Sequence, residues 1–141
     1  MSTVAKKNLQ NIPSGVDSGK TLRLVKSGKY FSDYFNFLKL LSKESDEAIA
    51  RWLNIDVKSF KTYQHSKEDL KKPVLLEHVI MLISLFKHGY DIFGTPDNFK
   101  TWLNQANFYF DKKSPSHFLD TISGIRFIDD RLTALEFGDN A

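Results

Sequence analysis

The strongest constraint on the fold is an apolar run between Pro73 and Gly89, which predicts a single buried helix. Proline is favoured in a first helical turn, because its missing N–H would have no partner there. Lys87 and His88 place positive charge in the last turn, and Gly89 is positioned for a left-handed cap. A helix that is apolar on nearly every face must be buried from several sides. Its apolar residues are Val74, Leu75, Leu76, Val79, Ile80, Met81, Leu82, Ile83, Leu85 and Phe86.

Length and composition narrow the class further. The run is too short to cross a bilayer and carries Glu77 and His78, so we expect no membrane partner. The 141 residues contain no cysteine, which excludes disulfides and thiolate metal sites and favours a reducing, cytoplasmic location. The first 20 residues are polar and contain Gly and Ser, so we expect residues 1–24 to form a flexible N-terminal tail, not a signal segment.

Helical periodicity accounts for the remaining chain. Apolar side chains recur at the i, i+3, i+4, i+7 spacing between Ser27 and Leu41, which predicts an amphipathic helix. No alternating β-branched run occurs, so we assign the chain to the all-α class. We expect a helix-turn-helix lobe at residues 25–72 and a second helical lobe within residues 73–141, joined by the long buried central helix.

The segment Asp46–His65 fits a helix-turn-helix pattern position by position. Ala50 supplies the small residue needed where the two helices cross, and Asn54 tolerates the positive φ needed at the turn. Asp56 can cap the second helix. The apolar positions are filled by Ile49, Leu53, Ile55, Phe60 and Tyr63. The outward positions of the second helix, which suit phosphate or base-edge contacts, are Lys58, Ser59, Lys61, Thr62 and His65.

A plain helical hairpin with a solvated polar face is the alternative to a DNA-binding motif, because such hairpins are common. The charge distribution favours DNA. Residues 1–72 hold 14 Lys/Arg against 8 Asp/Glu, a net charge of +6, whereas residues 73–141 hold 6 against 9, a net charge of −3. A basic first half and an acidic second half indicate two different partners, the first of them nucleic acid.

Residue pairs that combine a cap with a proline mark the helices of the second lobe. Thr95-Pro96 predicts the start of one helix, and Ser114-Pro115 predicts a short helix that Ser123-Gly124 breaks. A last helix with one apolar face is expected between Ile125 and Gly138. The residues expected to form the structural core of this lobe are Trp102, Leu103, Pro115, Phe118, Leu119 and Gly124.

Enzyme chemistry has little support in the sequence. The acids Asp120, Asp129 and Asp130 are ordinary for a helical surface, and there is no glycine-rich phosphate loop and no Cys nucleophile. We therefore expect no enzyme, no catalytic residue, no metal site and no cofactor. The four histidines, which lack metal-ligand spacing and are expected to be structural or solvated, are His65, His78, His88 and His117.

The stretch from Phe99 to Gly138 resembles the C-terminal toxin-binding domain of the Xre/MbcA/ParS-like antitoxins. The upstream helix-turn-helix and the central apolar helix also follow that family's order, so the resemblance covers roughly residues 25–138. The chain departs from the family pattern at Ala106, where Pro is usual, and at Asp111-Lys112-Lys113, where the family often has Gly. The matching features are Trp102-Leu103, Ala106-Asn107, Ser114-Pro115, Phe118-Leu119, Thr121, Gly124 and Phe137-Gly138.

The resemblance implies two partners for this chain. One is a toxin of the RES or ParT type, which has an ADP-ribosyltransferase-like fold and consumes or uses NAD. The other is the operator DNA of the chain's own operon, which the helix-turn-helix is expected to bind and repress. The family dimerises and covers the NAD cleft of its toxin, so a homodimer and occlusion of that cleft are expected here as well.

An acidic tip at the end of the last helix is the predicted plug for the toxin cleft, because a cleft that holds a pyrophosphate presents cationic and N–H groups. The alternative for these residues is a frayed terminus without a function. The alternative for the whole chain is a stand-alone transcriptional regulator whose C-terminal lobe only dimerises. The predicted toxin-binding residues are Glu136, Phe137, Gly138, Asp139, Asn140 and Ala141.

Overall fold

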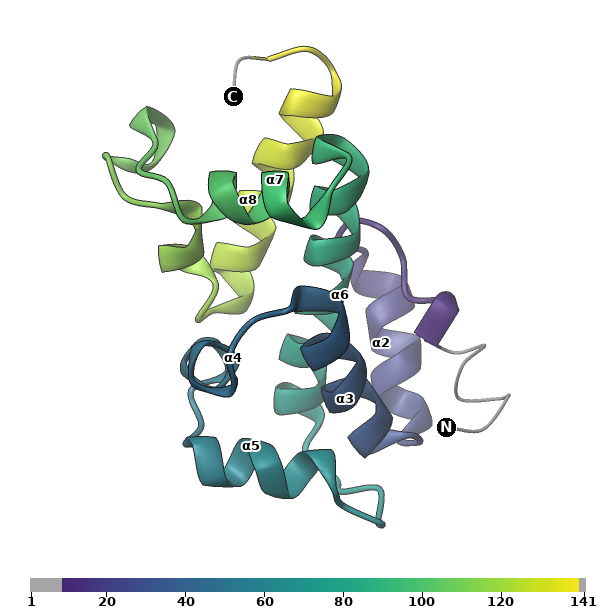
Figure 1. Cartoon of the computed structure of the whole chain (residues 1–141). Coiled ribbons are helices and arrows are strands. Elements are labelled where there is room, and N and C mark those ends of the chain that lie inside the picture. Colours follow the sequence, from purple (N-terminus) through teal and green to yellow (C-terminus); the bar gives the residue numbers. More distant parts are fainter. Residues whose placement is uncertain (1–8, 140–141) are drawn as a thin grey trace.

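The computed structural model describes residues 9–139 and confirms the all-α class (Figure 1). No β-strand occurs among these residues, and Asn107 and Lys113 form an isolated antiparallel bridge. The helices in chain order are α2 (Ser18–Ser27), α3 (Phe31–Ser42), α4 (Asp46–Leu53), α5 (Val57–Gln64), α6 (Pro73–Phe93), α7 (Pro96–Leu103), the 3-10 helices η1 (Phe108–Phe110) and η2 (Pro115–Phe118), and α8 (Ile122–Glu136).

The apolar helix α6 lies at the centre of the molecule (Figure 1). It packs against α2, α3 and α4, and against α7 and α8. Its side chains from Val79 to Phe86 are all buried, as the apolar run predicts. A helix of this composition can only be stable inside other elements, so it organises the chain around it.

The end of α6 differs from the prediction. Gly89 does not end the helix, which continues to Phe93 and is closed by Gly94 at φ 81°. The Gly94 N–H donates to the Tyr90 carbonyl oxygen at 2.8 Å. Gly89 is needed for close packing instead, because a Cβ there would lie 2.4 Å from the ring of Phe99.

The pair α4 and α5 has the local geometry that the sequence predicts. The Ser45 side chain caps α4 by accepting from the Ala48 N–H at 3.1 Å, and Asn54 takes a left-handed conformation at φ 57°. The Asp56 carboxylate caps α5 by accepting from the Ser59 N–H at 2.6 Å, and this hydrogen bond lowers the pKa of Asp56. These caps fix where both short helices begin and end.

The prediction of a flexible tail over residues 1–24 is wrong for residues 9–24; residues 1–8 lie outside the described part of the chain. Leu9 and Ile12 are buried, and the Lys87 ammonium donates to both of their carbonyl oxygens, at 3.0 and 2.8 Å. Helix α2 then begins after Asp17, whose carboxylate accepts from the Lys20 N–H. Because polar residues outnumber apolar ones here, composition alone concealed this helix.

Helix α3 begins later than the predicted start at Ser27. The chain turns at Gly28, φ 63°, and again at Tyr30, φ 65°. The Phe31 N–H, which opens α3, donates to the Asp69 carboxylate at 3.0 Å. The interhelical turn therefore comes before Phe31, and the predicted single helix is divided between α2 and α3.

Gly124 does not break a helix as predicted. Helix α8 begins at Ile122, with the Thr121 hydroxyl accepting from the Gly124 N–H at 2.9 Å. A Cβ at Gly124 would lie 1.8 Å from the Phe118 carbonyl oxygen, so glycine is needed where η2 crosses the first turn of α8. Of the residues expected in the core of this region, Trp102, Leu103, Pro115, Leu119 and Gly124 are buried and Phe118 is half-buried.

Candidate functional site

The outward face of α5 is an open, basic surface. Phe60 is buried against α3, whereas four of the five residues predicted for DNA contact are exposed. Ser59 is the exception and is half-buried. A shallow depression of about 750 Å³ crosses this face and contains no acidic residue. Its lining residues are Val57, Lys58, Lys61, Thr62, His65 and Ser66.

The turn before α5 is attached to the C-terminal region. The Asn54 side-chain amide donates to the Asp120 carbonyl oxygen at 2.8 Å. The carbonyl oxygen of the preceding residue, Leu119, accepts from the ring Nε2 of His78 on α6 at 2.9 Å. Burial lowers the pKa of His78, which keeps this ring neutral and structural. The first bond joins the α4–α5 turn to the η2–α8 turn, and the second joins α6 to that same turn.

The predicted acidic tip is partly engaged inside the chain. The Glu136 carboxylate pairs with the His88 ring at 3.1 Å, and the Asp139 carboxylate accepts from Arg131 at 3.3 Å. The Phe137 side chain is 81% exposed, and Gly138 turns the chain at φ 98°. Two carboxylates of the tip therefore have partners within the chain, whereas the Phe137 ring is exposed. Asn140 and Ala141 lie outside the described residues.

His88 forms a cluster that sequence patterns did not reveal. Its Nδ1 lies 2.8 Å from Asp129, and its Nε2 lies 3.1 Å from Glu136, so one ring joins α6 to two turns of α8. Asp129 is buried, not on the surface as expected, and also accepts from the Val16 N–H at 3.1 Å. The hydrogen bond to Asp129 raises the pKa of His88, and the bond to Glu136 raises it further.

This cluster predicts a pH-dependent contribution of His88 to stability. A raised folded-state pKa stabilises the protein fully below the unfolded-state pKa, about 6.5, and this stabilisation is lost as pH rises through the folded-state value. Urea unfolding of the wild type and of His88→Gln should therefore differ by about 1.5–3 kcal/mol at about pH 6 and by less at about pH 9. A difference that stays constant with pH would contradict a charged His88.

The segment between α7 and η2 is a tightly bonded loop. The Asn107 side chain accepts from the Tyr109 N–H at 3.0 Å, and its backbone N–H donates to the Lys113 carbonyl oxygen at 3.0 Å. Asp111 and Lys112 both adopt left-handed conformations, at φ 53° and 65°. A left-handed backbone, which glycine usually supplies, is therefore adopted here by an aspartate and a lysine.

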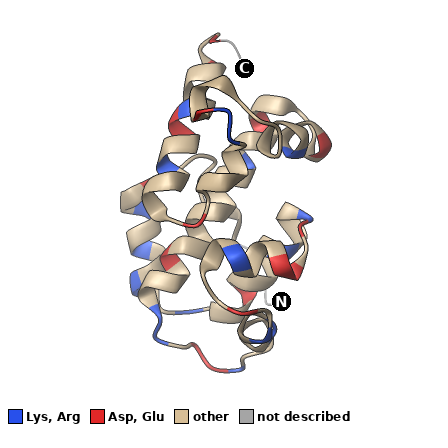
Figure 2. Cartoon of the chain, turned by 90° about the vertical axis from the view of Figure 1, so that its left-hand side faces the viewer, with Lys and Arg blue, Asp and Glu red and all other residues tan. Residues whose placement is uncertain are grey.

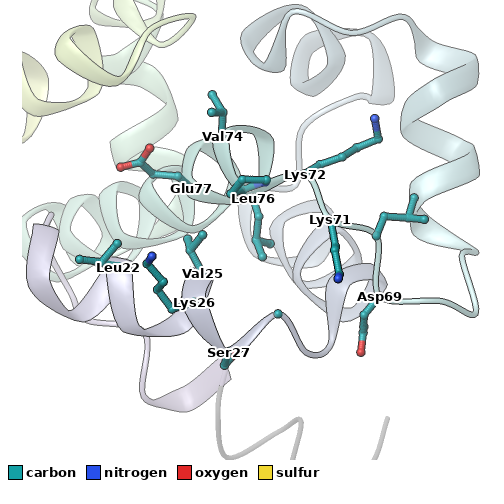
Figure 3. A pocket seen from close by; sticks show the side chains of 13 residues that line it. Leu22, Val25, Lys26, Ser27, Asp69, Lys71, Lys72, Val74, Leu76 and Glu77 are labelled. Atoms are coloured by element: carbon teal, nitrogen blue, oxygen red, sulfur yellow. The ribbon is translucent and has the colours of Figure 1, made fainter.

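An apolar groove of about 540 Å³ lies between the C-terminal end of α2 and the N-terminal end of α6 (Figure 3). Sequence reasoning missed it because residues up to 24 were expected to be flexible. The i, i+3 spacing of Leu22 and Val25 was the available signal. Its lining residues are Leu22, Val25, Lys26, Ser27, Gly28, Asp69, Leu70, Lys71, Lys72, Pro73, Val74, Leu76 and Glu77.

Residues 9–139 hold neither a metal-binding cluster nor a membrane-spanning helix. That range holds no group of three or more His, Cys, Asp or Glu side chains placed to bind a metal ion. None of its helices has the length and apolar content that a membrane crossing requires.

Comparison with known proteins shows that the C-terminal region is similar to a described protein family. Residues 88–138 match the family model described as the antitoxin Xre/MbcA/ParS C-terminal toxin-binding domain. The matched segment runs from the end of α6 through α7, the bonded loop and α8 to Gly138. No curated protein and no solved structure matches the chain. The family match supports an antitoxin that has a cognate toxin as its partner.

Proposed function

We propose that this chain is the antitoxin of a type II toxin–antitoxin system and binds its toxin through residues 88–139. The family match over residues 88–138 carries this proposal, because it covers the tip and the bonded loop together. Following the resemblance, the toxin is an NAD-consuming protein of the RES or ParT type. The tip around Phe137 occludes the NAD cleft of that toxin and so neutralises it.

Co-expression with the product of the adjacent gene tests this function. The adjacent product alone should arrest growth, and the full chain should restore growth and co-purify with it. A chain lacking residues 137–141 should lose protection, because the exposed Phe137 is removed while the buried core stays intact. If the adjacent product is harmless and does not co-purify, the chain is a stand-alone regulator. If the shortened chain protects fully, the tip is not the plug.

We also propose that α5 binds operator DNA and represses the operon. The support is the exposed cluster of Lys58, Lys61, Thr62 and His65 on one side of a helix whose opposite side is buried. The left-handed Asn54 and the Asp56 cap set the angle at which this helix leaves α4. Lysine side chains of this kind neutralise phosphates, and the hydroxyl and imidazole groups suit base edges.

The double variant Lys58→Ala/Lys61→Ala should bind a promoter fragment more weakly than the wild type. Each lysine that contacts a phosphate contributes about one unit to the slope of log affinity against log salt, so the slope should fall by about two. The matched control is Lys112→Ala/Lys113→Ala, which removes the same charge from the distant loop and should leave the slope nearly unchanged. Equal mobility shifts for both double variants would remove α5 from the DNA interface.

A homodimer completes the proposal, with the groove between α2 and α6 as its contact surface (Figure 3). Val74 and Leu22 both line this groove and are 74% and 55% exposed. A two-fold axis places a surface against itself, so charged groups within the patch need partners of opposite sign in the same patch. The groove contains charges of both signs: Lys26, Lys71 and Lys72 are basic, and Asp69 and Glu77 are acidic.

Val74→Glu should shift the chain from dimer to monomer, because it places an unpaired charge in the apolar contact. Light scattering during size-exclusion chromatography measures this directly. Leu40→Glu is the matched control, since Leu40 is 70% exposed on α3 but does not line the groove. A Val74→Glu chain that remains dimeric would place the dimer contact elsewhere.

A further inference from the structure

Exposed aromatic side chains gather within the matched segment. Phe108 is 86% exposed and Tyr109 is 54% exposed, at the start of η1. Phe127 and Phe137 on and beyond α8 are exposed as well. Large exposed aromatic groups mark interaction surfaces, and buried aromatic anchors dominate the binding energy of most protein interfaces.

The three aromatic residues of η1 have different roles. Phe110 is buried and makes an edge contact with Trp102 at 6.3 Å and with Phe127 at 5.4 Å between ring centroids. This single ring anchors the loop to the core. Phe108 and Tyr109 are therefore not needed to bury the loop, and they project from it.

The loop holds these two rings in a fixed position. The Lys112 N–H donates to the Asn107 carbonyl oxygen at 3.0 Å, and the Lys113 N–H donates to the Phe110 carbonyl oxygen at 2.9 Å. Asp111 and Lys112 accept left-handed conformations that residues other than glycine seldom adopt. A loop bonded in this way loses little conformational entropy when its rings enter a partner.

Arg131 connects this loop to the tip. Its guanidinium carbon lies 3.6 Å from the centroid of the Tyr109 ring, and its Nη1 donates to the Asp139 carboxylate at 3.3 Å. The loop and the tip are thus adjacent parts of one surface. Figure 2 shows basic and acidic segments interspersed along the helix that leads to the C-terminus, so this surface has no single charge to steer a partner.

A shallow hollow beside the rings completes the surface. It has a volume of about 350 Å³ and lies against the buried Trp102, which is only 7% exposed. A hollow of this size has room for an apolar side chain. The residues that line it are Trp102, Gln105, Ala106, Asn107, Phe108 and Tyr109.

We infer that Phe108 and Tyr109 form a second toxin anchor, separate from the tip, which inserts into an apolar hollow on the toxin surface. This inference rests on the proposed antitoxin function. The tip blocks the cleft, whereas the anchor supplies the affinity and the specificity for the cognate toxin. Arg131 positions the anchor relative to the tip.

Titration calorimetry with the purified product of the adjacent gene tests the anchor. The variant Phe108→Ala/Tyr109→Ala should bind at least about tenfold more weakly than the wild type, because exposed aromatic anchors dominate such interfaces. Leu40→Ala, an exposed apolar truncation on α3, should bind like the wild type. Promoter binding of the double variant should be unchanged.

Each outcome decides a separate point. If the wild type binds the toxin and the double variant binds within about twofold of it, the anchor is excluded and the proposed function stands. If the wild type does not bind, the proposed function fails and the anchor fails with it. If the double variant melts at a lower temperature, the toxin affinity of the single variant Phe108→Ser tests the anchor instead. The Phe108 side chain is highly exposed, so its loss should have little effect on folding.

Discussion

Trp102→Ala is expected to lower the free energy of unfolding by about 3–5 kcal/mol, as truncation of a buried Trp does. Trp102 is 7% exposed and lies at the centre of an aromatic cluster. Its ring centroid is 5.4 Å from Phe93, 6.1 Å from Phe99 and 6.3 Å from Phe110. Truncation opens a cavity between α6, α7 and η1, and it removes the support of the bonded loop.

Urea unfolding followed by near-ultraviolet circular dichroism measures this loss. Phe108→Ala is the control, because it removes an aromatic ring that is exposed, two residues before the buried Phe110. The control should change the free energy of unfolding by no more than about 0.5 kcal/mol. A Trp102→Ala chain with unaltered stability would show that Trp102 is a surface residue, and it would then be an interface candidate.

Gly124→Ala is expected to destabilise the chain by about 1–3 kcal/mol or more, although alanine is the better helix former. The added Cβ would lie 1.8 Å from the Phe118 carbonyl oxygen, which belongs to the backbone and cannot rotate away. Relief requires η2 to move off the first turn of α8. Thermal unfolding should show the loss, and toxin binding should weaken with it.

Gly19→Ala provides the matched control within α2. A Cβ at Gly19 meets only the Asp17 carboxylate at 3.6 Å, which is ordinary contact. The control should leave stability unchanged or raise it by up to about 1 kcal/mol, because alanine restricts the unfolded chain. If Gly124→Ala behaves like Gly19→Ala, then η2 does not contact α8 as closely as described.

Local patterns predicted the elements whose causes are local. The Ser45 and Asp56 caps and the left-handed Asn54 act over three or four residues, so their sequence signals were sufficient. The apolar composition of α6 likewise predicted a central buried helix. Cap residues and apolar periodicity can be recognised in the sequence without knowing any tertiary contact.

Glycine was the main source of error. Gly89 and Gly124 were both interpreted as helix ends, and both lie inside helices where another element approaches closely. Glycine can either end a helix or allow another element to pack closely against it. Only the contact with Phe99 at Gly89, or with Phe118 at Gly124, distinguishes these two roles. The residues next to each glycine in the sequence do not reveal this contact.

The candidate site depended on long-range contacts. His88 and Asp129 are 41 residues apart, and neither has a motif that predicts their pairing. The anchor rings are part of Phe108–Phe110, and only the structure shows which of the three rings is buried. The exposure of the α5 residues was easier to predict than these contacts, because an amphipathic helix separates its own buried and exposed faces; their binding of DNA stays a prediction.

In the proposed antitoxin, the C-terminal loop and tip together form the toxin-binding surface. Hydrogen exchange of the full chain, measured by mass spectrometry with and without the purified adjacent gene product, tests it most directly. The account predicts added protection in peptides covering residues 104–113 and 131–139, with α5 unchanged. Protection confined to α4 and α5, or no protection in the presence of saturating partner, would contradict it.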